Sequence, residues 1–295
     1  MYFILPHMRC KTQSTQPNSF SERIGALMRP MSNRRLISIA AGVSPELEGD
    51  PSTFVEVAAR AGWEGTGVWF DPSTWTDKTT SEVRKRVEDT GLTVVDMEVV
   101  RMGPKGDCGE RLIEAASIIG ARNILSISNF DSIEATAERL NELCVLARPS
   151  NIRVCIEFMR FTSVRSLADA LRVIELVEQD NAGILVDLIH VFRSGTTYKQ
   201  IRAVDPTLLP YAQWCDAQAE PDGWSTKELI RDAVDGREIP GEGQLPINEF
   251  ETLFDTSVPF SVEVRSKKLR SVFPDFTERA IHLLSATKAA VTVTG

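Results

Sequence analysis

The sequence is short of the residue types that several classes of protein require. It contains only 5 cysteines and 3 histidines among 295 residues, and no Cys-x-x-Cys pair. A disulfide framework and a cysteine-ligated zinc site are therefore not expected, and the thiols indicate a reduced, cytoplasmic protein. No apolar run approaches the roughly 20 residues of a membrane span, so no membrane association is expected. A net charge of −8 also disfavours nucleic acid as a partner.

The first 34 residues differ in composition from the rest of the chain. Over residues 1–30, Ser, Thr, Gln and Pro are frequent, Glu22 is the only acid, and no apolar periodicity persists. The apolar stretch Tyr2–Leu5 is too short for the core of a signal peptide. We predict a flexible N-terminal extension over residues 1–34. A segment that straps the barrel, a chain start at Met31 and a transit peptide remain as alternatives.

From residue 35 to 290 the sequence alternates between short β-branched runs and amphipathic stretches that end in glycine. The predicted strands are Leu36–Ala41, Thr66–Phe70, Leu92–Val99, Asn123–Ile127, Ile152–Phe158, Gly183–Asp187, Tyr211–Cys215 and Pro259–Val264. The predicted helices are Pro51–Ala61, Asp77–Asp89, Asp107–Ile119, Asp131–Leu146, Ser163–Glu178, Lys199–Val204 and Asp275–Lys288. The long segment Gln218–Ile247 is expected to be a polar connection.

This alternation predicts one α/β domain, a single (β/α)8 TIM barrel over residues 35–290. An open, doubly wound sheet is the alternative. Such a sheet usually carries a Gly-x-Gly-x-x-Gly turn after its first strand, and the sequence AAGVSPELEGD at 40–50 has no such turn. The closed barrel is therefore the preferred fold.

Three acids and one amide lie at or near the ends of the last four predicted strands. They are Glu157, Asp187, Gln213 and Glu263. Strand ends meet at the mouth of a barrel, so these side chains are expected to converge there. Three carboxylates in one place repel one another unless a cation neutralises them, and oxygen ligands suit Mg²⁺ or Mn²⁺. The alternative is that each acid pairs with a nearby arginine, namely Arg160, Arg193 or Arg265.

Several short motifs make the chain resemble the xylose-isomerase-like TIM-barrel superfamily, which includes sugar phosphate isomerases and epimerases and 3-dehydroshikimate dehydratase-like enzymes. The motifs are DLIH at 187–190, PYAQWCDA at 210–217, IPGEGQLPI at 239–247 and SVEV at 261–264. Many members carry His where this chain has Gln213. Glutamine is also an oxygen ligand, and it occurs there in some of the dehydratases.

The resemblance implies a metal site formed by Glu157, Asp187, Gln213 and Glu263. It also implies that Glu157 and Glu263 are the catalytic acid and base. One divalent ion is expected, Mn²⁺ first, with Mg²⁺ or Co²⁺ as alternatives. The residues expected to bind substrate are His190, Arg193, Arg265, Glu98 and Trp69.

Such a site indicates an enzyme that acts on a small molecule. We expect a metal-dependent isomerase or epimerase of a small polyhydroxy ketone or sugar, phosphorylated or not, that reacts through a metal-stabilised enediolate. A metal-dependent lyase or dehydratase is the alternative on the same site. A zinc nuclease is disfavoured, because it needs many imidazoles and a basic face. A homo-oligomer is left open.

Overall fold

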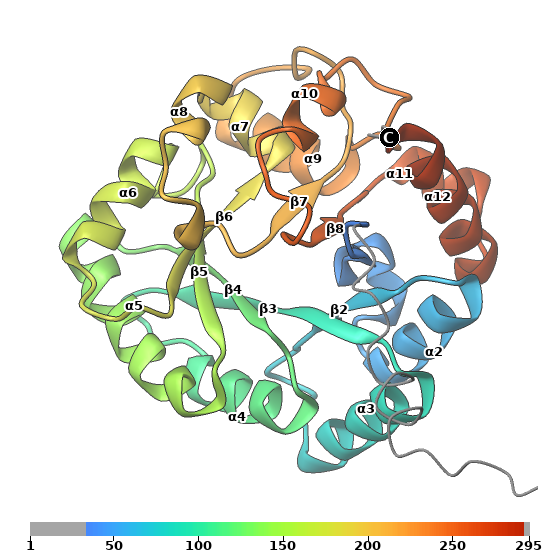
Figure 1. Cartoon of the computed structure of the whole chain (residues 1–295), viewed down its shortest axis with the longest axis horizontal. Helices are drawn as coiled ribbons and strands as arrows, with labels where there is room; N and C mark the ends of the chain where they lie inside the picture. The colour runs from blue at the N-terminus through green and yellow to red at the C-terminus, as the bar shows by residue number, and fades with distance from the viewer. Residues whose placement is uncertain (1–33, 292–295) are drawn as a thin grey trace, which may run out of the picture. The chain divides into compact units, whose positions relative to one another are not determined.

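Eight parallel strands close into a barrel in which each strand pairs with the next along the chain and β8 pairs with β1 (Figure 1). This computed structural model describes residues 34–291, so the predicted extension lies outside the described residues except for Arg34. The strands are β1 Ile37–Ile39, β2 Gly65–Trp69, β3 Thr93–Met102, β4 Asn123–Ser128, β5 Arg153–Glu157, β6 Ala182–Asp187, β7 Ala212–Trp214 and β8 Phe260–Val262. The predicted TIM barrel is confirmed.

Helices follow the strands and form the outer ring seen in Figure 1. They are α2 Pro51–Ala61, α3 Asp77–Thr90, α4 Gly109–Ile119, α5 Ile133–Ala147, α6 Leu167–Leu176, α7 Leu188–Ser194, α8 Tyr198–Arg202, α9 Thr226–Asp235, α10 Ile247–Glu251, α11 Lys267–Val272 and α12 Phe276–Ala290. Short 3₁₀ turns lie at Ala41–Val43, Pro45–Leu47, Arg148–Ser150 and Pro206–Leu208. In the described part of the chain, no helix combines the length and apolar character needed to cross a membrane.

Local sequence explains where many of these helices begin and end. Helix α2 begins after Asp50, whose side chain accepts a hydrogen bond from the backbone N–H of Thr53, and Pro51 occupies the first turn. It ends at Gly62, which adopts a left-handed conformation with φ of 91°. Because such caps are local in sequence, the predicted and observed bounds of α2 agree.

Four short or charged helices were not predicted, namely α7, α9, α10 and α11. The polar connection predicted over 218–247 contains α9, in which Leu229 and Ala233 are buried and a Ser225–Glu228 capping box closes the first turn. Its remaining positions are mostly charged, which hid the helix. Helix α7 starts directly after β6 and stops at Gly195, and its seven residues were too short a stretch to show a periodic pattern.

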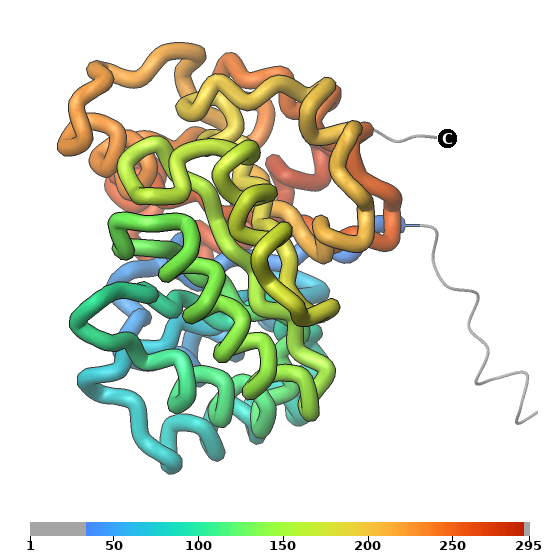
Figure 2. The backbone as a smooth tube through the Cα atoms, turned by 90° about the vertical axis from the view of Figure 1, so that its left-hand side faces the viewer, coloured from blue at the N-terminus to red at the C-terminus, as the bar shows by residue number. Residues whose placement is uncertain are grey.

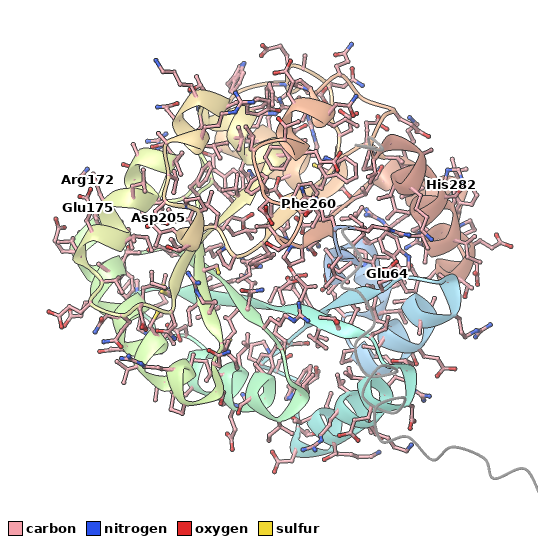
Figure 3. All side chains as sticks on the ribbon, in the orientation of Figure 1. Glu64, Arg172, Glu175, Asp205, Phe260 and His282 are labelled. Carbon is pink, nitrogen blue, oxygen red and sulfur yellow. The ribbon has the colours of Figure 1, made fainter. Side chains whose placement is uncertain are left out.

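The barrel interior is filled by apolar side chains on the amino-terminal side of the site. Val95, Leu125, Cys155, Leu185 and Tyr211 form a cluster of their own, contributed by strands β3, β4, β5 and β6 and the segment before β7. The larger core lies between the strands and the helices. In Figure 3 Phe260 lies inside the helix ring, whereas Arg172 and His282 lie at its rim. This packing leaves the carboxyl ends of the strands as the place for a polar site.

The first and last strands complete the barrel. Ile37 pairs with Phe260 and Ile39 with Val262, so the chain closes on itself with parallel register. Figure 2 shows this from the side, where the blue start of the described chain runs beside orange and red C-terminal segments. Glu263, which directly follows β8, is thereby brought next to strands from both halves of the sequence.

Candidate active site

The four residues predicted from strand ends lie on adjacent strands of the barrel. Glu157 ends β5 and Asp187 ends β6, while Gln213 lies in β7 and Glu263 directly follows β8. In the strand register Asp187 is the partner of Gln213. All four side chains are buried. Glu157 and Glu263 line a cavity of about 370 Å³ at this end of the barrel.

The side-chain ends of these residues are close enough to share a cation. One end of the Gln213 amide lies 3.1 Å from Oδ2 of Asp187 and 3.2 Å from Oε2 of Glu263. As an NH₂ group this end donates to both carboxylates. As an oxygen it lies, from one oxygen of each carboxylate, at about the 3 Å spacing of adjacent ligands around a hard octahedral ion. Ligand atoms of Glu157, Asp187 and His190 also lie within 4.8 Å of one another.

This donor set fits a divalent metal ion. It consists of buried carboxylates, one amide and one imidazole, without a thiolate ligand among them, which is the chemistry of Mg²⁺, Mn²⁺ and related ions. Asp187 belongs to both the oxygen set with Gln213 and Glu263 and the group with Glu157 and His190. Glu157, Asp187, Gln213 and Glu263 are therefore the residues that would hold the ion, with His190 beside them.

Arg237 is a member of the site that the sequence analysis missed. Its guanidinium donates from Nη1 to Oδ2 of Asp187 at 2.7 Å, and its Nη2 lies 2.8 Å from Oε2 of Glu263. Its Nε donates to the carbonyl of Ala233 in α9, which fixes the orientation of the planar group. Arg237 is 3% exposed, so these two ion pairs are shielded from water.

The alternative pairing of the acids with arginines is thus partly realised, but with a different arginine. Arg160 donates to the carbonyl of Arg193, and Arg265 pairs with Glu48. The signal for Arg237 was its position two residues before the IPGEG loop, within the stretch taken for a polar connection. Its burial comes from β-bridges that link Asp216 to Glu238 and Gly236 to Ser266, which a local pattern does not reveal.

The acids of the site differ in charge state because their partners differ. Burial alone raises the pKa of Asp187, but Arg237 and His190 together hold it below its usual value. Burial raises the pKa of Glu263, and Arg237 opposes that rise. Burial and the neighbouring Asp187 and Glu263 raise the pKa of Glu157 well above its usual range. The surroundings of Asp187 and Glu263, which share Arg237, therefore favour the charged form more than those of Glu157 do.

His190 lies one helical turn after Asp187, at the start of α7. Its Nε2 is 3.8 Å from Oε1 of Glu157, and Phe161 packs edge-on against its ring. Burial lowers the pKa of His190 to about 4, so the imidazole is neutral at physiological pH. Within residues 34–291 its Nδ1 has no hydrogen-bond partner. A neutral imidazole can serve as a ligand or as a hydrogen-bond partner for substrate.

The structure places the other predicted substrate-binding residues in two groups. Trp69, Glu98 and Arg265 line the cavity together with His190, and the Arg265 guanidinium lies 5.5 Å from the centre of the Trp69 ring. Arg193 does not line this cavity. It forms an ion pair with Asp232 at 2.8 Å and donates to the carbonyls of residues 218 and 219, so its contacts are those of a structural residue.

Asp216, the acid of the PYAQWCDA motif, shapes the loop that precedes β8. Its carboxylate accepts hydrogen bonds from the backbone N–H groups of Ala217, Gly241, Gly243 and Leu245, at 2.8 to 3.1 Å. All of its hydrogen-bonding capacity is therefore used by the backbone. It holds the loop that begins just after Arg237, and so acts on the site through the position of that arginine.

The closed (β/α)8 barrel carries its buried carboxylates at the carboxyl ends of β5, β6 and β8, which is the end where enzymes of this fold have their active sites. The sequence family described as the xylose isomerase-like TIM barrel matches residues 55–281. The chain belongs to this family. Its resemblance to the superfamily, inferred from the motifs, is thereby confirmed.

Individual relatives are distant. An inosose isomerase of Halalkalibacterium halodurans is 25% identical over 112 residues, which cover 37% of each chain. The chain thus spans less than half the length of the curated relatives it matches. A solved structure of the IOLI protein with a bound zinc atom has a TM-score of 0.70 and 14% identity, over 86% of this chain and 95% of that one. A probable 3-DHS dehydratase of Bacillus anthracis has a TM-score of 0.65 and 16% identity, over 84% and 98%.

Proposed function

We propose that this protein is a divalent-metal-dependent isomerase or epimerase of a small polyhydroxy ketone or sugar, and that it works by removing a proton from a carbon next to the carbonyl. The observation that carries the proposal is the convergence of Asp187, Gln213 and Glu263 at the carboxyl ends of neighbouring strands. Glu263 lines one cavity together with Glu157 and His190. The inosose isomerase relatives agree with this class of reaction.

Glu263 and Glu157 are the proposed proton carriers, and their surroundings assign them different roles. The ion pair with Arg237 at 2.8 Å favours the carboxylate form of Glu263, which suits a general base. Within residues 34–291 Glu157 forms no ion pair with an arginine, and burial raises its pKa in the metal-free chain, which suits a group that returns a proton to the substrate. Strands β6 and β7 separate the two groups in the barrel, so they approach a bound substrate from different sides.

The metal, with Mn²⁺ as the first candidate, would supply Lewis-acid polarisation of the substrate carbonyl and an adjacent hydroxyl. The chain's own groups then decide the outcome. If Glu263 takes the proton and Glu157 returns one to the opposite face of the same carbon, the product is an epimer. If the proton returns to the neighbouring carbon, the product is an aldose–ketose isomer.

A second candidate function is a lyase, and Glu98 is the observation that favours it. This carboxyl group lines the same cavity, and its Oε1 has no hydrogen-bond partner among the described residues. Burial, followed by the charges of Asp96 and Glu263, raises its pKa well above the usual value. A protonated carboxyl group can donate a proton to a leaving hydroxide, so the same site can lose water after the first proton is removed. The probable 3-DHS dehydratase shares this fold.

Incubation with a panel of keto-sugars and cyclic hydroxy-ketones in D₂O tests the two functions. The chain is loaded with Mn²⁺, carbon-bound proton exchange is followed by NMR, and new conjugated products are followed by ultraviolet absorbance. Exchange without new absorbance supports the isomerase, and growing absorbance assigns the lyase instead. The matched variants Glu263→Gln and Glu157→Gln should both lose exchange. Absence of exchange and absorbance across the whole panel overturns both functions.

We also propose that small molecules are the physiological partners and that nucleic acid is not one. The support is the acidic balance of the chain, with 41 acidic against 33 basic residues. The cytoplasm is the compartment that the reduced cysteines favour. Four described cysteines, Cys108, Cys144, Cys155 and Cys215, are free thiols.

A further inference from the structure

A second cavity adjoins the one that contains the carboxylates. It has a volume of about 650 Å³, compared with about 370 Å³ for the first. The two cavities share Trp69, Val99 and Arg101 as lining residues, so they meet at the ends of β2 and β3. A substrate that fills the first cavity can therefore extend a substituent into the second.

The acids that line this second cavity are already neutralised or hydrogen-bonded by the protein. Glu48 pairs with Arg265 at 3.4 Å, and Asp107 pairs with Arg139 at 2.8 Å. Asp71 accepts hydrogen bonds from the backbone and side chain of Ser73 at its own turn. Glu48 and Asp107 are thus balanced by arginines, whereas Asp71 keeps its negative charge at its own turn.

Two basic residues in the same lining have no such partner. Arg101 is the second-last residue of β3, and Lys105 lies three residues after that strand; both are exposed. Within residues 34–291 neither forms a hydrogen bond or an ion pair with the protein. The third basic residue, Arg111, donates instead to the carbonyls of Pro72 and Trp75. The second cavity therefore holds an excess of free positive charge beside an apolar wall.

We propose that Arg101 and Lys105 bind an anionic substituent of the substrate, so that the substrate class is a hydroxy-ketone that carries a carboxylate or a phosphate. This deepens the proposed function and rests on it for the identity of the reacting end. Arg101 lies where the two cavities meet, so it fixes the distance between the charged group and the reacting carbon. Its planar guanidinium binds a carboxylate or phosphate through paired hydrogen bonds, and Lys105 adds a point charge.

Three ketoses of equal carbon number isolate the effect of the charge. They are D-fructose, which is neutral, D-fructose 6-phosphate and 5-keto-D-gluconate. Calorimetric titration of the full chain, with Mn²⁺ and again with EDTA, gives Kd for each. The two anionic ketoses should bind at least about tenfold more tightly than D-fructose, since two charge-assisted contacts are added. Arg101→Gln combined with Lys105→Gln should remove that preference and leave the Kd for D-fructose within about twofold. The relative affinity of the two anions identifies phosphate or carboxylate.

Arg172→Gln is the matched control, because Arg172 lies on α6 at the outer rim of the helix ring (Figure 3) and should change none of these affinities. Equal binding of all three ketoses by the unaltered chain, or no measurable binding of any, overturns the anion site. An equal loss for D-fructose and the anions in the double variant also overturns it. The proposed function fails separately, through absence of proton exchange in D₂O. Preference for anions in EDTA without any exchange would refute the reaction and keep the anion site.

Discussion

Two pairs of buried acids in this barrel have similar burial and different electrostatic surroundings. Asp187 and Glu263 share the guanidinium of Arg237 and the amide of Gln213. Asp96 and Glu98, both on β3, have no such cation in hydrogen-bonding contact among the described residues, and one oxygen of each is without a partner. Burial raises the pKa of Asp96 to about 7 and that of Glu98 well above its usual value.

The different pKa shifts of the two pairs show that burial alone does not decide whether a carboxyl group is charged. All four groups are at most 8% exposed. What separates them is the supply of hydrogen-bonded positive charge, which the chain provides at the mouth between β6 and β8 and not beside β3. The pair that shares Arg237, here called the charged pair, is suited to holding a cation and abstracting a proton. The β3 pair, whose pKa values burial raises, is suited to donating one.

Glu263→Gln should have the largest effect, because it removes an anion from the charged pair. We expect turnover to fall about 10³-fold or more, since a base and a metal ligand are lost together. Metal stoichiometry by equilibrium dialysis and proton exchange by NMR measure the two losses. Glu98→Gln is the comparison variant, and it should keep the metal. Full metal occupancy in Glu263→Gln would remove this residue from the ligand set.

Arg237→Met should leave Asp187 and Glu263 without a hydrogen-bonded cation, as Asp96 and Glu98 already are. Two buried carboxylates then lose their shared cation, which costs about 3–5 kcal/mol of unfolding free energy in EDTA. Urea unfolding measures the change. Addition of Mn²⁺ should recover part of it, because the ion supplies the missing positive charge. A variant as stable as the unaltered chain in EDTA would show that the ion pairs contribute nothing net.

Asp96→Asn should stabilise the metal-free protein at pH 8 by roughly 1–4 kcal/mol. In the folded chain the pKa of Asp96 is about 7, compared with about 3.9 in an unfolded chain. Between these values the folded state binds a proton that the unfolded state lacks. The stability that this proton confers is full below about pH 4 and is lost as pH rises through about 7. Asparagine does not titrate, so the variant does not lose this stability as the pH rises.

Urea unfolding in EDTA at pH 5 and pH 8 checks this sign. The variant and the unaltered chain should differ most at pH 8, and the variant should show a smaller loss of stability on going from pH 5 to pH 8. An unchanged pH slope in Asp96→Asn would mean that this acid is paired in solution. Asp222→Asn, at an acid that is exposed on the surface, is the control and should leave the slope unaltered.

Gln213→His should have the smallest effect of the four. A neutral imidazole replaces a neutral amide, so the charge of the site is unchanged and activity should stay within about tenfold. The preference should move from Mn²⁺ or Mg²⁺ towards Zn²⁺ or Co²⁺, because nitrogen is a softer ligand than an amide oxygen. Competition dialysis between Mn²⁺ and Zn²⁺ measures the shift. A preference for Mn²⁺ that survives in Gln213→His would show that the other ligands set it.

Much of the fold follows from local signals in the sequence. Asp50 before α2 and Gly62 after it mark that helix completely, and the β-branched run before Asp187 marks β6. Helix α9 was not predicted because only Leu229 and Ala233 among its residues are buried. A helix held by so few buried positions has a charged pattern that resembles a connection.

The site was predictable where its residues sit at strand ends, and not where a long-range contact places them. Glu157, Asp187 and Glu263 each follow an apolar run, so topology alone brings them together. Arg237 enters the site through a loop that is folded back by Asp216 and by a bridge between Gly236 and Ser266. Arg193 shows the converse, since it follows a strand by six residues and yet its guanidinium is occupied by Asp232.

The loop anchored by Asp216 also constrains how this chain can change over evolutionary time. The backbone N–H of Gly243 donates to the Asp216 carboxylate, and a Cβ at position 243 would collide with that same carboxylate. The Cβ would also collide with the backbone carbonyl oxygen of Ala217, so glycine is required at 243 while the loop keeps this path. The two positions should covary across related sequences, with glycine at 243 wherever aspartate stands at 216, although 26 residues separate them along the chain.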